Sequence, residues 1–195
     1  MIAILLNDAS FEQDIRELLM AFYPGETFTH KEEEAGEADL IVRGVRDGNS
    51  FSLDVTPVKK EAVHFALIYP DFSNRFETKN EIKQTLYRLL SAQTGRELPW
   101  GTLTGIRPTK IALTKLYDGW TDEQIETYMR ETYFTSKEKI DLSIDVAERE
   151  RRLLSTIDYE NGYSLYVGIP FCPTTCLYCS FTSFPIVKWE KRMDL

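Results

Sequence analysis

The chain has 195 residues, enough for one domain or two small ones. Its hydrophobic residues (43%) can form a buried core, and its charged residues (28%) leave a net charge of −8. This acidic balance argues against a nucleic-acid partner, because binding to phosphates depends on Lys and Arg.

The N-terminal residues, MIAILLND, contain no basic leader, so we expect no signal peptide. No apolar run approaches the ~20 residues that span a bilayer, and we therefore expect no membrane span. Three clustered cysteines, an odd number, fit a reducing compartment and a metal role better than a disulfide framework. The composition thus predicts a cytosolic protein.

The first part of the chain, residues 1–96, has the pattern of a small α+β domain. A strand over Ile2 to Leu6 precedes a helix whose apolar residues recur every three or four positions from Phe11. Strand-like runs then lead to a second helix, which we expect to start at the capping-box pattern Thr78-x-x-Glu81. These runs are Thr27 to His30, Leu40 to Val45, Phe51 to Val58 and Val63 to Tyr69. This order of elements favours an α+β fold.

The next part, residues 97–160, is predicted to be a helical linker domain. Pro108 suits the first turn of one helix, and Thr121 opens a second. A capping-box pattern from Thr135 starts a long third helix. A turn then leads into the last part, residues 161–195.

The segment Trp100 to Lys110, WGTLTGIRPTK, turns at Gly105 and then places Arg107, Pro108 and Lys110 at a helix start. A helix N-terminus and an arginine fork can bind carboxylates or phosphates. Arg107 and Lys110 are therefore candidate contacts to an acidic ligand. On the residues alone, the preferred alternative is an ordinary helix start with solvated charges.

All three cysteines of the chain lie in one stretch near its end. The residues from Tyr163 to Phe181 read YSLYVGIPFCPTTCLYCSF, with Cys172, Cys176 and Cys179 spaced as C-x3-C-x2-C. Three thiolates cannot complete a structural zinc site, which needs a fourth nitrogen or sulfur ligand. They can hold three irons of a cubane cluster and leave the fourth iron open. The alternatives are buried structural thiols and an incomplete zinc site.

The residues before the cysteines alternate as a strand with two distinct faces should. Leu165, Val167 and Ile169 alternate with Tyr166 and Gly168. The proline that follows cannot donate to a ladder, so we expect strand pairing to stop there and a loop to begin. A half-buried strand aromatic is the plain alternative to a functional role for the tyrosine.

The cysteine loop, with Tyr178 directly before its last cysteine, resembles the signature of the radical S-adenosylmethionine (SAM) enzymes. The longer string YVGIPFC, followed by CLYCSF, resembles the oxygen-independent coproporphyrinogen III oxidase family. The segment Trp100 to Lys110 and the long extension before the strand resemble its HemZ-type coproporphyrinogen dehydrogenase branch. The resemblance implies that residues 161–195 are the first strand, cluster loop and helix start of a (β/α) partial TIM barrel.

We expect this barrel to be incomplete, because a single strand and loop cannot bury themselves. The chain also contains no Gly-Gly pair, which the superfamily uses to hold the SAM amino group. The sequence is therefore interpreted as the N-terminal part of a longer radical SAM enzyme, inactive by itself.

The resemblance also implies roles for individual residues. The three cysteines hold a [4Fe-4S] cluster, and SAM binds to its open iron. Tyr166 is the candidate catalytic residue and points toward the cofactor, whereas Tyr178 lies beside the adenine through its backbone. Phe181 packs in the same place or shields the cluster, which tunes cluster potential. Gly168 is grouped with these cofactor-binding positions, and the family usually has a histidine there.

The implied reaction is the oxygen-independent oxidative decarboxylation of coproporphyrinogen III in haem biosynthesis. A 5′-deoxyadenosyl radical abstracts hydrogen from a propionate, and loss of carbon dioxide and an electron leaves a vinyl group. Two rounds give protoporphyrinogen IX, and an electron donor is required. The alternatives are a haem chaperone that carries the same loop without decarboxylase activity, and a simple electron-transfer or zinc module.

Overall fold

The structure is a computed structural model that describes residues 1–58, 63–105, 107–158, 161–177 and 179–190. The chain divides into two compact units, Met1–Leu153 and Leu154–Leu195. The boundaries expected from the sequence, at residues 96 and 160, stay a prediction. None of the described helices is long and apolar enough to cross a membrane.

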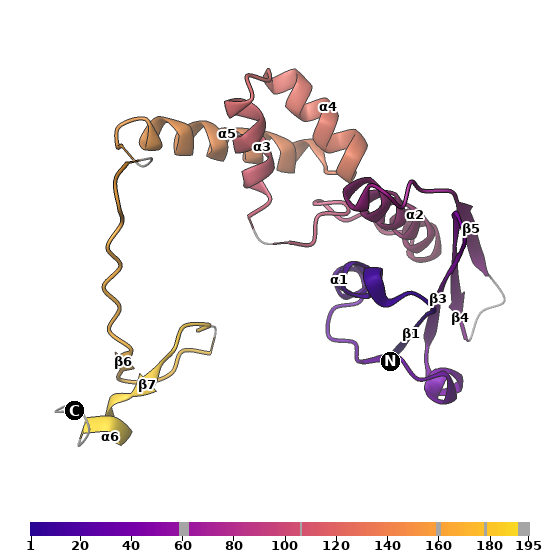
Figure 1. The fold of residues 1–195 in the computed structure, drawn as a ribbon. Helices are drawn as coiled ribbons and strands as arrows, with labels where there is room; N and C mark the ends of the chain where they lie inside the picture. The colour runs from indigo at the N-terminus through magenta and orange to yellow at the C-terminus, as the bar shows by residue number, and fades with distance from the viewer. Residues whose placement is uncertain (59–62, 106, 159–160, 178, 191–195) are drawn as a thin grey trace. The chain divides into compact units, whose positions relative to one another are not determined.

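The first unit contains a five-stranded mixed sheet, which lies at one edge of this unit (Figure 1). Its strands lie in the order β2-β1-β3-β4-β5. Strand β1 is parallel to β2 and β3, whereas β3–β4 and β4–β5 are antiparallel pairs. The strands are β1 (Ile2–Leu6), β2 (Phe28–Thr29), β3 (Leu40–Asp47), β4 (Ser50–Pro57) and β5 (His64–Ile68). Every strand predicted for this part of the chain is present, and the α+β class is confirmed.

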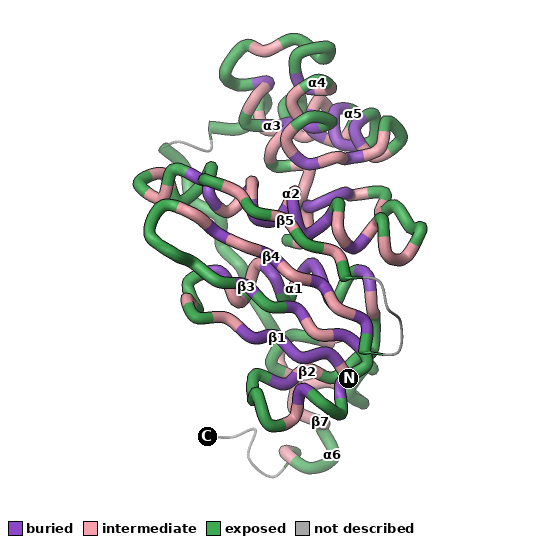
Figure 2. The backbone as a smooth tube through the Cα atoms, turned by 90° about the vertical axis from the view of Figure 1, so that its right-hand side faces the viewer, coloured by how far each residue is buried: buried purple, intermediate pink, exposed green. Residues whose placement is uncertain are grey.

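One face of the sheet is buried against helices α1 (Glu12–Phe22) and α2 (Arg75–Thr94). Residues alternate between buried and partly exposed along β4, as expected of a sheet with one covered face (Figure 2). The core joins strand residues to residues of both helices, with Ile4, Leu53, Ile15, Leu19 and Leu86 among its members. Burial of each such side chain contributes about 1.5–3 kcal/mol.

Helix α2 begins one turn earlier than the capping-box pattern predicted. The side chain of Asn74 accepts a hydrogen bond from the amide N–H of Glu77 at 3.3 Å and so caps the helix. The hydroxyl of Thr78 instead donates to the carbonyl of Asp71 at 2.8 Å. The prediction of a helix start at Thr78 was wrong, because asparagine supplies the same capping acceptor one turn earlier.

Three further helices of the first unit share a core of their own. They are α3 (Thr109–Tyr117), α4 (Asp122–Tyr133) and α5 (Lys137–Leu154). A capping box between Thr121 and Gln124 starts α4, as the sequence predicted. The capping box predicted from Thr135 does not form, because its hydroxyl is buried without a hydrogen-bond partner among the described residues.

The second unit does not contain the strand that alternation predicted over residues 165–169. Residues 162–170 have no regular secondary structure, and Tyr166 is 82% exposed. A strand needs the N–H and C=O groups of a neighbour, and no described strand lies beside these residues. The predicted first strand of a barrel is therefore not formed in this structure, and a barrel stays a prediction.

Strand pairing in the second unit begins after Pro170 instead of ending there. The carbonyl of Pro170 accepts a hydrogen bond from the amide N–H of Phe184 at 2.7 Å. The elements that follow are β6 (Phe171–Cys172), which pairs in parallel with β7 (Phe184–Pro185), and α6 (Ile186–Trp189). Proline lacks a donor but keeps its carbonyl acceptor, so it can start this pairing.

Candidate functional site

The three cysteines follow one another through β6 and the loop after it. Cys172 and Cys179 are half-buried, and Cys176 is exposed. The amide N–H of Cys179 donates to the carbonyl of Cys176 at 3.0 Å. None of the described residues forms a group of three or more Cys, His, Asp or Glu side chains that could hold a metal ion. The donor chemistry thus fits an iron–sulfur cluster, but the structure does not bring the three thiols together as a metal site.

The other residues predicted around the cofactor are largely solvent-exposed. Phe181 is 77% exposed, and its carbonyl oxygen accepts a hydrogen bond from the thiol of Cys179 at 3.8 Å. The ring of Tyr166 lies against Gly168, where an added Cβ would stand 2.9 Å from a ring carbon. A side chain at position 168 would therefore have to displace the tyrosine ring. Tyr178 lies outside the described residues.

An aromatic cluster next to Cys172 was not identified from the sequence. The ring of Phe184 lies 6.1 Å from that of Phe171 and 4.8 Å from that of Trp189, between centroids. The density of aromatic residues after the cysteines was the available signal. These three aromatic rings pack together beside β6 and form a small apolar cluster next to the cysteine loop.

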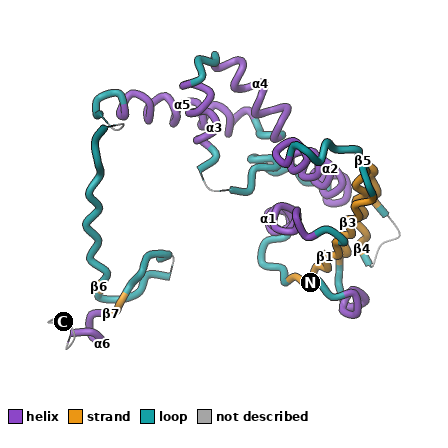
Figure 3. The backbone as a smooth tube through the Cα atoms, in the orientation of Figure 1, coloured by secondary structure: helices purple, strands orange, loops and turns teal. Residues whose placement is uncertain are grey.

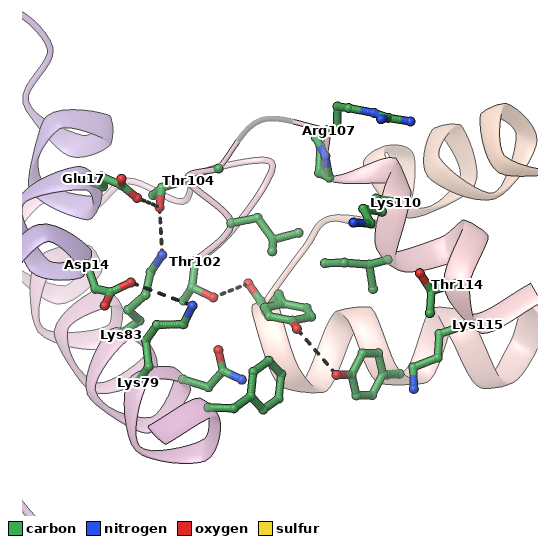
Figure 4. A pocket seen from close by; sticks show the side chains of 18 residues that line it. Asp14, Glu17, Lys79, Lys83, Thr102, Thr104, Arg107, Lys110, Thr114 and Lys115 are labelled. Atoms are coloured by element: carbon green, nitrogen blue, oxygen red, sulfur yellow. Dashed lines mark hydrogen bonds and ion pairs between the residues drawn. The ribbon is translucent and has the colours of Figure 1, made fainter. Parts of the chain in front are cut away.

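A cleft of about 500 Å³ in the first unit is a second candidate site (Figure 4). The two predicted anion contacts, Arg107 and Lys110, both line it. The structure adds three lysines, Lys79, Lys83 and Lys115, which sequence analysis missed. Among the described residues, the lining thus carries five cationic side chains but only two carboxylates, those of Asp14 and Glu17.

The most buried of these cations is Lys83, which is 7% exposed. Its ammonium group donates to the hydroxyl of Thr104 at 2.8 Å, and this hydroxyl donates to the carboxylate of Glu17 at 2.9 Å. Burial lowers the pKa of Lys83, although the charges of Asp14 and Glu17 act in the opposite direction. The ammonium is therefore held at the cleft through a hydroxyl and not by a direct carboxylate contact.

Arg107 stands at the start of α3 with a left-handed backbone, at φ 59°. This conformation is uncommon for a residue with a Cβ. Its guanidinium donates to the carboxylate of Glu150 at 3.0 Å, and its carbonyl accepts the amide N–H of Lys110. For Lys110, no ion-pair partner occurs among the described residues.

We compared the chain with family models, solved structures and curated proteins, and one curated relative matches it. No family model and no solved structure matches it. The oxygen-independent coproporphyrinogen-III oxidase-like protein HemZ of Bacillus subtilis (strain 168) is 36% identical to it over 135 residues. The chain resembles HemZ-type proteins. The resemblance drawn from the cysteine loop and from WGTLTGIRPTK is therefore confirmed.

The match covers 67% of this chain and 26% of the relative. The chain thus spans about a quarter of the length of the HemZ protein that it matches. This similarity supports the interpretation of the chain as a HemZ-type N-terminal portion.

Proposed function

We propose that the chain is the N-terminal part of a cytosolic HemZ-type radical SAM oxidoreductase. The observation that carries this proposal is the C-x3-C-x2-C loop, found in a chain 36% identical to a coproporphyrinogen-III oxidase-like protein. The proposed reaction is the oxygen-independent conversion of two propionates of coproporphyrinogen III to vinyl groups, giving protoporphyrinogen IX.

In this proposal, Cys172, Cys176 and Cys179 hold a [4Fe-4S] cluster that leaves one iron for SAM. When bound, the cluster would supply the one-electron reduction of SAM with which this class of reaction starts. An electron donor would then reduce the cluster again. The chain's own contribution is to present three thiols that are free of disulfides, one of them exposed. The rings of Phe171 and Phe184 would exclude water beside the first of these thiols.

Tyr166 and Gly168 are proposed to stand near the cofactor. The tyrosine ring lies beside the glycine, so it occupies the space that a side chain at position 168 would need. The tyrosine would orient the bound cofactor, with Tyr178 and Phe181 completing the adenine side. The histidine usual at position 168 in the family is absent from this chain.

A haem chaperone is the second candidate function, and Gly168 is the observation that favours it. A glycine cannot donate or accept a proton through a side chain, so a reaction that needs the usual histidine would fail here. A protein of this kind would bind haem through the same family scaffold without decarboxylating a porphyrinogen.

Product analysis of the full-length protein distinguishes the two functions. The reconstituted protein is incubated anaerobically with coproporphyrinogen III, SAM and a reductant, and the porphyrins are separated after oxidation. The enzyme proposal predicts protoporphyrin together with 5′-deoxyadenosine, and it predicts a lower rate for Tyr166→Phe. Tight haem binding with no porphyrin product would reject the enzyme in favour of the chaperone.

A further inference from the structure

The charge of the cleft in the first unit is opposite to that of the chain as a whole. The chain has a net charge of −8, yet the cleft is lined by five cationic side chains and two carboxylates. Figure 4 shows Lys79 and Lys83 on α2 on one side, and Lys110 and Lys115 on α3 on the other. Cations therefore face the cavity from two separate elements.

Arg107 and Lys115 are paired with carboxylates outside the lining, those of Glu150 at 3.0 Å and Asp118 at 3.8 Å, so the charge left for a ligand is that of the other three lysines. Lys79 lies 3.9 Å from the carboxylate of Asp14, and Lys83 reaches Glu17 only through Thr104. Lys110 has no ion-pair partner in the part of the chain that the structure describes. An anion in the cavity would gain charge-assisted hydrogen bonds that the protein's own carboxylates do not supply.

The rest of the lining is apolar and aromatic. Phe76, Leu103, Ile111, Tyr128 and Tyr133 contribute to it. The volume of about 500 Å³ is in the range of small-molecule sites, which combine apolar walls with a few placed polar groups. A simple inorganic anion would leave this apolar wall unused.

We propose that this cleft binds a small molecule with an apolar or aromatic body and at least two anionic groups. One anionic group is held by Lys79 and Lys83, and another by Lys110. The site lies in the first unit and needs neither iron nor SAM. Tetrapyrrole carboxylates are one source of such groups, and this identification rests on the proposed function; nucleotide phosphates are the other.

A binding titration of the chain without iron or SAM tests the proposal with two probes. Coproporphyrin III presents carboxylates on an aromatic macrocycle, and ATP presents phosphates on an aromatic base. We expect at least one of them to bind saturably, as measured by porphyrin fluorescence or by calorimetry. The double variant Lys83→Met/Lys110→Gln should bind it about tenfold or more weakly, because two charge-assisted contacts are lost.

The matched control is Lys139→Gln on α5, which removes one cation outside the cleft lining. Circular dichroism checks that each variant is folded. If the double variant does not fold, the single variant Lys110→Gln is used for the same binding measurement. Unchanged affinity in the variants, equal loss in Lys139→Gln, or no binding of either probe would overturn the proposal. Binding of ATP alone supports the anion site and rejects the tetrapyrrole source, without bearing on cluster chemistry at the cysteines.

Discussion

Lys83 is a residue whose environment disfavours its own charge. The side chain is 7% exposed, and burial is the largest influence on its pKa, which it lowers. A buried cation without a direct carboxylate contact destabilises the folded state relative to an apolar side chain of similar length. Residues of this kind are frequent at binding sites, where a ligand supplies the missing partner.

We predict that Lys83→Met leaves thermal stability at pH 7 unchanged or raises it. Because the folded pKa is below the ordinary value of 10.5, the unfolded chain binds the proton more tightly between the two values. The wild-type protein therefore gains stability from this group as the pH rises through that window, and the advantage of the variant shrinks. Melting temperatures at pH 7 and pH 10 measure this, and a large loss at pH 7 would show that the ammonium stabilises the fold.

Gly101 is the glycine at which the structure most clearly excludes a side chain. Its φ is +57°, and an added Cβ would collide with the carbonyl of Tyr133. That same carbonyl accepts the amide N–H of Thr102 at 2.7 Å, so it cannot move without cost.

We predict that Gly101→Ala lowers the free energy of unfolding by about 1–3 kcal/mol, through strain and displacement of this carbonyl. Gly105→Ala is the matched control in the same segment, because no atom stands within 4 Å of its added Cβ. Urea denaturation of both variants makes the comparison. Equal stabilities for the two would contradict the structure of this segment.

At the scale of elements, the cap of α2 is the clearest difference between the predicted and observed helices. We predict that Asn74→Ala costs about 1 kcal/mol of unfolding free energy, because the N–H of Glu77 loses its acceptor. Asn74→Asp should retain most of the stability, since its carboxylate accepts the same hydrogen bond. Urea titration monitored by helical circular dichroism checks both variants, and a loss equal in both would refute the capping role.

The strands of the first unit could be predicted because their signals are local. The strand-like run Phe51 to Val58 predicted β4, and the turn between β3 and β4 has Gly48 at φ +55°, as a hairpin at that position requires. The start of α2 was missed because two residues, Asn74 and Thr78, each suit a cap, and only tertiary contacts decide between them. The alternation of apolar residues before the cysteines predicted a strand that does not form, because a strand also needs a partner.

The cleft could be predicted only in part, for a related reason. Arg107 and Lys110 were recognisable together because they are adjacent in sequence at a helix start. Lys79 and Lys83 lie one helical turn apart on α2, which predicts a shared face but not what faces it. Only the tertiary fold of the first unit, in which α4 contacts both α2 and α3, brings these cations to one cavity.

For the molecule as a whole, the cysteine loop stands out in the sequence because the spacing of its thiols predicts the ligands of a cluster. The geometry of the loop could not be compared with that of a cluster site. The described residues form no metal site, and the stretch before the cysteines is not part of a sheet. The chain spans about a quarter of the HemZ protein that it matches. The three thiols are thus proposed as ligands from their chemistry, and their arrangement around a cluster is the central claim to be tested.

Anaerobic iron–sulfur reconstitution of the full-length protein, followed by electron paramagnetic resonance with and without SAM, tests that claim most directly. We predict a reduced [4Fe-4S] signal that changes when SAM is added and that is lost in Cys172→Ala, Cys176→Ala and Cys179→Ala. Thr174→Ala, in the same loop, is the control and should keep the signal. A spectrum indifferent to SAM, or a cluster that survives loss of these cysteines, would contradict the account.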